Sequence, residues 1–130
     1  MILVIAEQRG DVLNPVSWET VSAAQQFGDA VKIVVAGDGP FGIAEELAAA
    51  DVSEVLVVDH PALEPYTSDG FVDAIAQVVR VEQPELVLWP HTYQTRDYAP
   101  KLATRLDRVL IPDCTGLKTH DGGRLLIRPM

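Results

Sequence analysis

The sequence is poor in cysteine, aromatic residues and positive charge. Its 130 residues include one cysteine, Cys114, which excludes an internal disulfide framework and a cysteine-rich metal site. Aromatic residues make up 6%, and 10 Lys and Arg stand against 19 Asp and Glu, for a formal net charge of -9. A chain this acidic lacks the basic face that binds a phosphate backbone, so we expect no nucleic-acid partner.

Long hydrophobic runs are also lacking. The apolar run at Ile2–Ala6 is too short to span a membrane, and no basic start of a signal peptide precedes it. We therefore expect no direct membrane insertion, no targeting segment, and a reduced, cytoplasmic setting of the bacterial type. The length and the hydrophobic fraction of 48% predict a single domain over residues 1–130.

Short apolar runs, typical of buried strands, alternate with segments of helical spacing. The strands are expected at 2–6, 31–36, 55–58 and 86–89, with a short fifth strand at 109–111. This alternation predicts an α/β fold: a doubly wound, mainly parallel sheet in the order 3-2-1-4-5, with helices on both faces. Residues 117–119 and 124–127 flank a turn and predict a carboxyl-terminal β-hairpin.

The helix starts are predicted from capping residues. Asn14-Pro15 offers the first start, with Ser17 as a rival cap, and the second helix is expected at Ile43–Ala50. Ser68 is expected to cap the third helix. Asp97 is expected to cap the fourth, which would place Pro100 in the first turn, where its missing N–H has no cost.

Residues 37–42 match the dinucleotide fingerprint G-x-G-x-x-G: they follow a strand, open a helix, and have Asp59 about twenty residues later. Two residues oppose this interpretation. Pro40 has no N–H to offer a pyrophosphate, and Asp38 places a negative charge where phosphates would sit. The alternative, which we favour, is a tight strand-to-helix turn that needs glycine for its backbone.

The segment after the fourth strand has the better position for a ligand. In the predicted order, strands one and four are neighbours, and ligands bind outside their carboxyl ends. Residues 7–8 leave the first strand there, and residues 91–97 leave the fourth. Arg96 has the chemistry to bind a phosphate or carboxylate in bidentate fashion. The alternative, which we favour, is an ion pair of Arg96 with Asp97, Asp113 or Glu7.

No set of catalytic or metal-binding residues emerges. His60, His91 and His120 are scattered near turns without metal-ligand spacing. His91 could act as a base, but no nucleophile and third member accompany it. Cys114 is interpreted as a small core residue. We therefore expect no catalytic residue and no metal site, and an enzyme is the least favoured hypothesis.

Several short motifs together carry a family resemblance. They are Ile2–Glu7, Glu46–Ala48 leading to Val55–Asp59, Leu63-x-x-Tyr66, Asp113 and Arg128-Pro129. The most specific part is Pro90-His91-Thr92 followed by Arg96-Asp97-Tyr98-Ala99-Pro100-Lys101-Leu102-Ala103-x-x-Leu106. With these motifs, the chain resembles the amino-terminal domain of the electron transfer flavoprotein alpha subunit over essentially all its residues. Thr95 stands where that family usually has glycine, and a β-branched residue disfavours positive φ, so we expect a differently shaped loop there.

The resemblance implies an electron carrier and not an enzyme. It implies an alpha–beta heterodimer with one FAD, and commonly an AMP, that moves electrons from flavoprotein dehydrogenases to a quinone oxidoreductase. It also implies that FAD is held mainly by a carboxyl-terminal domain of alpha, which is absent from this sequence, and that AMP belongs to the beta subunit. The chain ends directly after a predicted strand, as an incomplete domain would.

We therefore expect a scaffold domain that binds no cofactor by itself, packs on the beta subunit and supports the FAD-binding domain. Its residual candidates for cofactor binding are Thr92, Arg96 and Asp97. The alternative is a stand-alone adenine-nucleotide-binding α/β module, which would use the glycine turn or the loop after the fourth strand.

Overall fold

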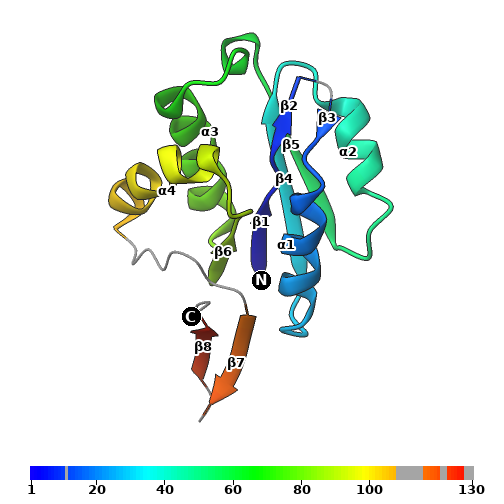
Figure 1. Ribbon diagram of the computed structural model, residues 1–130, viewed down its shortest axis with the longest axis vertical. Helices are drawn as coiled ribbons and strands as arrows, with labels where there is room; N and C mark the ends of the chain where they lie inside the picture. Colours follow the sequence, from blue (N-terminus) through cyan, green and yellow to red (C-terminus); the bar gives the residue numbers. More distant parts are fainter. Residues whose placement is uncertain (11, 108–115, 121–122, 128–130) are drawn as a thin grey trace.

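A computed structural model describes residues 1–10, 12–107, 116–120 and 123–127 of the chain (Figure 1). Its centre is a four-stranded parallel sheet in the order β5-β4-β1-β6. The strands are β1 (Ile2–Ile5), β4 (Val31–Gly37), β5 (Glu54–Asp59) and β6 (Leu86–Leu88). This confirms the predicted order 3-2-1-4, and the fifth strand expected at 109–111 lies outside the described residues.

Helices cover both faces of the sheet, as Figure 1 shows. They are α1 (Val16–Gln25) and α2 (Phe41–Leu47) on one face, and α3 (Ser68–Glu82) and α4 (Tyr93–Leu106) on the other. Successive side chains of a strand point to opposite faces, so Ile2 and Val4 pack toward α1 and α2, whereas Leu3 and Ile5 pack toward α3 and α4. A strand buried on both faces must be apolar throughout, which explains the unbroken run that predicted it. The doubly wound α/β fold is confirmed.

Two short segments and one predicted element fall outside this central sheet. β2 (Gln8–Arg9) pairs antiparallel with β3 (Val12–Leu13), and η1 (Pro61–Leu63) is a single 3-10 turn. The sequence predicted no strand or helix at either place, because elements of two or three residues are too short to show periodicity. The predicted hairpin is confirmed: β7 (Gly116–His120) pairs antiparallel with β8 (Gly123–Ile127). Among the described residues, no helix is both long and apolar enough to cross a bilayer.

At the first helix, one of the two predicted starts is confirmed, whereas at the third helix the cap differs from the prediction. At the start of α1, the Asn14 Oδ1 atom accepts a hydrogen bond from the Val16 N–H at 3.0 Å, so Asn14 and not Ser17 turns the chain into the helix. At α3 the cap is Thr67, whose Oγ1 accepts from the Gly70 N–H at 3.2 Å, and the prediction of Ser68 was wrong by one residue. Both residues have a hydroxyl, and only the extended backbone of Thr67 decides between them.

Two other helix starts were also placed too late. α2 begins at Phe41 and not at Ile43, because Pro40 stands at the cap position with its φ already near the helical range. α4 begins at Tyr93, so the prediction of an Asp97 cap was wrong and Pro100 lies inside the helix. The true cap is Thr92, whose Oγ1 accepts from the Thr95 N–H at 3.2 Å.

The cap of α3 gives a direct test of this assignment. Thr67→Ala removes the acceptor of the Gly70 N–H and should lower the free energy of unfolding by about 1 kcal/mol. Ser68→Ala is the matched control: it removes only an exposed contact with Lys101 and should cost less than about 0.5 kcal/mol. Urea denaturation followed by circular dichroism measures both. A larger loss in the Ser68 variant would contradict the assignment.

Candidate functional site

The carboxyl ends of β1 and β6 lie side by side, with Val4 paired to Leu88 in register. The strand order reverses here, which makes this edge the predicted position for a ligand. Glu7 follows β1 and Thr92 follows β6, and their side chains meet: the Thr92 hydroxyl donates to the Glu7 Oε1 atom at 2.5 Å. The structure therefore brings together the two segments that the sequence assigned to this edge.

Glu7 is the centre of a larger hydrogen-bond network. Its other carboxylate oxygen, Oε2, accepts from the Asn14 Nδ2 atom at 2.7 Å. Its backbone N–H donates to the buried Ser17 Oγ at 3.0 Å, and its carbonyl accepts from the Asn14 N–H at 2.9 Å. One half-buried residue thus connects the end of β1 to the starts of α1 and α4. Sequence reasoning placed Glu7 at this edge but missed Asn14 and Ser17 as its partners.

The Thr92 and Thr95 hydroxyls also form hydrogen bonds within the protein. Thr92 donates to Glu7 and accepts from the Thr95 N–H, which uses both sides of its hydroxyl. Thr95 is buried, and its hydroxyl donates to the Pro90 carbonyl at 2.6 Å. Thr95 lies within the first turn of α4 with helical backbone, so no glycine conformation is needed at this position. The segment expected to be a loop is the start of a helix.

Arg96 lies exposed in the first turns of α4. Its Nη2 atom is 3.3 Å from the His91 Nε2 atom, and its guanidinium lies 5.8 Å from the centre of the Tyr93 ring. None of the described carboxylates forms an ion pair with it, so the favoured pairing with Asp97 or Glu7 was wrong, and Asp113 lies outside the described residues. Consecutive residues of a helix do not face each other, and the Glu7 oxygens already accept from neutral donors.

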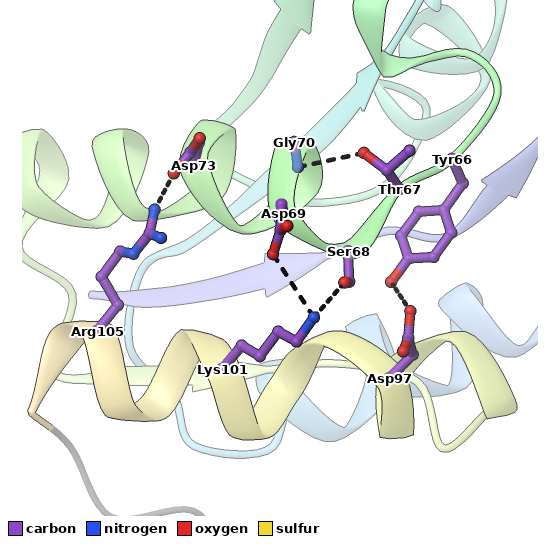
Figure 2. A network of polar contacts seen from close by, with 9 residues as sticks. All are labelled: Tyr66, Thr67, Ser68, Asp69, Gly70, Asp73, Asp97, Lys101 and Arg105. Carbon is purple, nitrogen blue, oxygen red and sulfur yellow. Dashed lines mark hydrogen bonds and ion pairs between the residues drawn. The ribbon is translucent and has the colours of Figure 1, made fainter.

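Asp97 belongs to the seam between α3 and α4 (Figure 2). Its Oδ2 atom accepts from the Tyr66 hydroxyl at 2.9 Å. Further along the seam, Lys101 donates to the Ser68 hydroxyl at 2.6 Å. Two ion pairs complete it, Lys101 with Asp69 at 3.5 Å and Arg105 with Asp73. All three candidates have contacts within the protein: Thr92 with Glu7, Asp97 with Tyr66, and Arg96 with His91 and the Tyr93 ring.

The tyrosines beside this seam have raised pKa values. Burial raises the pKa of the Tyr98 phenol, which is 1% exposed and packs 4.6 Å from the Phe71 ring centre. Burial, and then the hydrogen bond to Asp97, raise the pKa of Tyr66. Both effects disfavour the tyrosinate, so both phenols remain protonated well above pH 7.

The raised pKa of Tyr98 predicts alkaline destabilisation. Above about pH 10 the unfolded chain loses the Tyr98 proton while the folded chain retains it, so the free energy of unfolding falls as pH rises. The slope from this residue should reach about 1.4 kcal/mol per pH unit. Tyr98→Phe should flatten the profile over that range, measured by urea denaturation between about pH 8 and 11.5. An unchanged slope would contradict the buried, neutral state of Tyr98.

The glycine turn forms a closed structure of its own. The Asp59 Oδ1 atom accepts from the Gly39 N–H at 2.7 Å, and the His60 N–H donates to the Gly37 carbonyl at 2.9 Å. Gly39 has a φ of 63°, where glycine is favoured. The Asp59 carboxylate at the end of β5 therefore accepts the hydrogen bond of a backbone N–H that a bound phosphate would need. The acidic residue that completed the dinucleotide fingerprint binds the turn itself, which fits the tight-turn interpretation.

Gln8 is a buried polar residue that sequence reasoning missed as part of this region. Its Nε2 atom donates to the Ala36 carbonyl at 3.0 Å, so its amide lies across the end of β4. A Cβ atom built on Gly37 would lie 2.0 Å from that Nε2 atom. Two features of the sequence could have indicated this contact. Gln8 is a polar residue shortly after the buried strand β1, and Gly37 is a glycine at the end of the neighbouring strand β4.

The remaining candidates do not assemble. The His60 Nδ1 atom accepts from the Ala62 N–H at 3.0 Å and caps the 3-10 turn, while His120 belongs to β7. Cys114 lies outside the described residues. Within the part of the chain that the structure describes, no three His, Cys, Asp or Glu side chains gather in a way that could hold a metal ion.

The polar groups at the carboxyl ends of the strands are bonded to one another, which makes this side of the sheet rigid. The Glu7 carboxylate and the Thr92 and Thr95 hydroxyls form internal hydrogen bonds, and the Gly39 N–H of the glycine turn donates to Asp59. The described residues therefore do not by themselves fit the phosphates of a dinucleotide. Binding such a ligand would require these internal bonds to break, each with a cost of about 1–3 kcal/mol for the group left unpaired.

Comparison with known proteins supplies the family. The family model described as "Electron transfer flavoprotein domain" matches residues 2–130. The "Electron transfer flavoprotein subunit alpha" of Thermoanaerobacterium thermosaccharolyticum is 35% identical over 129 residues, which cover 96% of this chain and 39% of that protein. The subunit of the same name from Bacillus subtilis is 33% identical over 131 residues, covering 99% and 40%. The "Acryloyl-CoA reductase electron transfer subunit beta" of Anaerotignum propionicum is 36% identical over 120 residues, covering 89% and 33%.

Proposed function

This chain belongs to the electron transfer flavoprotein family, and we propose that it is the scaffold domain of an alpha subunit. It spans about two fifths of the length of the alpha subunits named above. The observation that carries the proposal is the closed network around Glu7: polar groups at the usual ligand-binding edge hold β1, α1 and α4 together. Such an edge supports a neighbouring domain better than it binds a cofactor.

In this proposal the domain acts within an alpha–beta complex that contains flavin. FAD is held outside residues 1–130, and AMP belongs to the beta subunit. The complete complex carries electrons from flavoprotein dehydrogenases to a quinone oxidoreductase and catalyses no reaction of its own. The relative from Anaerotignum propionicum is named as an electron transfer subunit of an acryloyl-CoA reductase, which supports a role in a larger electron-transfer assembly.

A flavin titration tests the scaffold role. The purified chain of residues 1–130, mixed with FAD and passed through a desalting column, should retain no stoichiometric flavin by absorbance at about 450 nm. A positive control is a full-length alpha subunit co-purified with its beta subunit, which should retain the flavin under the same conditions. Tight, stoichiometric FAD binding by the chain alone would overturn the proposal.

The stand-alone nucleotide-binding module makes the opposite prediction. Calorimetric titration of the chain with AMP, ATP and NAD should give no heat of binding if the domain is a scaffold. Binding at micromolar concentrations would instead favour the module. The Arg96→Ala variant then locates such a site, because Arg96 is the exposed cation on the first turns of α4. Loss of binding in that variant places the nucleotide at the carboxyl ends of β1 and β6, and retention places it elsewhere.

A further inference from the structure

The charge of this protein is distributed very unevenly along the chain. Residues 33–79 contain nine Asp and Glu and no Lys or Arg, which equals the net charge of -9 of the whole chain. The remaining residues hold 10 acidic and 10 basic side chains, which cancel. The excess negative charge therefore belongs to one segment, which runs from β4 through α2 and β5 into α3.

Part of that charge is neutralised within the fold. Glu54 pairs with Lys32 at 3.1 Å, Asp69 pairs with Lys101, and Asp73 pairs with Arg105. The exposed acidic residues of α2 and its flanking turns have no ion pair among the described residues; they are Asp38, Glu45, Glu46 and Asp51. Asp59, at the end of β5, and Glu64, after η1, also form no ion pair among the described residues. Four of these six uncompensated charges therefore lie around α2, beside the β5 edge of the sheet.

A groove with a mixed lining lies within this acidic region. It has a volume of about 440 Å³ and lies between α2 and the start of β5, lined by the apolar residues Phe41, Ala44, Ala48, Val52 and Val55 and by the polar residues Glu45, Ser53 and Glu54. Phe41 is 56% exposed, although a phenylalanine gains about 1.5–3 kcal/mol from burial. An exposed aromatic ring beside a groove is typical of a contact surface.

The neighbouring strand offers backbone groups as well. Among the described residues β5 pairs only with β4, so its other edge carries unpaired N–H and C=O groups that an extended segment can bind. A second copy of this chain is a poor occupant. Antiparallel pairing of two β5 strands would bring Glu54 of one copy opposite Asp59 of the other, where like charges repel. The same charges attract a segment that carries Lys or Arg.

We propose that the groove and free edge formed by α2 and β5 dock an extended, apolar segment flanked by lysine or arginine residues from a partner protein. Its apolar side chains lie against Phe41 and Ala48, its backbone pairs with β5, and its basic ends lie near Glu45 and Asp51. This surface is at the opposite edge of the sheet from β6, and the proposal does not depend on the scaffold role.

A synthetic nonapeptide tests this surface directly. The probe is Lys-Lys-Val-Thr-Val-Thr-Val-Lys-Lys with a fluorescent label, titrated with the full chain at low salt and followed by fluorescence anisotropy. Binding should weaken at least about tenfold when salt rises from about 0.02 M to 0.5 M, because screening shortens the range of the attraction. In two-dimensional NMR, the amide signals that shift should be those of residues 41–57. A peptide with Glu in place of Lys should not bind.

Two variants of equal charge change separate this site from general attraction. Glu45→Lys reverses a charge at the groove and should weaken binding about fivefold or more. Glu19→Lys makes the same change on an exposed position of α1 and should change binding less than about twofold. Equal effects of the two variants, NMR shifts outside residues 41–57, or self-association through β5 in sedimentation would each overturn the proposal.

Discussion

Glu7→Ala should lower the free energy of unfolding by about 2–3 kcal/mol, because two donors lose a charged acceptor at once. The Thr92 hydroxyl and the Asn14 amide both donate to the Glu7 carboxylate, at 2.5 and 2.7 Å. Thr92 is 85 residues from Glu7 in the sequence and Asn14 is 7 residues away, so the Glu7 side chain forms one long-range and one local hydrogen bond. Urea denaturation measures the change, and NMR should show larger motion at the starts of α1 and α4.

Two variants serve as controls for this prediction. Glu7→Gln keeps one acceptor oxygen but turns an N–H₂ group toward the other donor, so it should lose about half as much as alanine. Glu19→Ala removes an exposed glutamate of α1 and should change stability by less than about 0.5 kcal/mol. If Glu7→Ala and Glu19→Ala were equally mild, the hydrogen bonds around Glu7 would not hold these elements together.

Gly37→Ala should be similarly destabilising, by about 2–3 kcal/mol, for a different reason. The added methyl group would lie 2.0 Å from the Gln8 Nε2 atom, which must then move away from the Ala36 carbonyl that it bonds. Gln8 is 9% exposed, so its displaced amide cannot reach water without disturbing its neighbours. The φ of Gly37 is not positive, so steric overlap and not backbone strain causes the loss.

A double-mutant cycle isolates this overlap. Gln8→Ala alone should cost about 1 kcal/mol, because it removes a buried side chain together with its one hydrogen bond. In that background the added methyl group keeps only an ordinary van der Waals contact with the Pro40 Cβ atom at 3.7 Å, so Gly37→Ala should be nearly neutral. This gives a coupling of about 2–3 kcal/mol between the two positions. Additive losses would mean that Gly37 is required for another reason, such as a ligand that approaches the turn.

Much of the fold was evident in the sequence because burial on both faces leaves a strong pattern. Strands such as β1 and β4 must be apolar throughout, and the alternation with helices allows few topologies. The position of the ligand-type edge followed from that topology, and Glu7 and Thr92 do meet there. Two of the family motifs contact each other in the structure, since Tyr66 of one donates a hydrogen bond to Asp97 of another.

The starts of helices were less predictable, because several residues can cap a helix and the choice depends on distant partners. Asp97 has good capping chemistry, yet the cap is Thr92, whose hydroxyl also donates a hydrogen bond to Glu7, far away in the sequence. Asp97 is instead used by Tyr66. Of the carboxylates expected to pair with Arg96, Asp97 and Glu7 accept from other donors for the same reason, and Asp113 lies outside the described residues.

The sequence by itself determined the α/β architecture, the strand order through β6, the carboxyl-terminal hairpin and the family. These depend on periodicity, length and motif, which are properties of neighbouring residues. The tertiary structure alone decided which polar groups remain free, because a hydrogen bond between residues 7 and 92 leaves no local trace. It also placed the exposed acidic residues of α2 and its flanking turns beside β5, which among the described residues is an edge strand, since only folding brings α2 and β5 together.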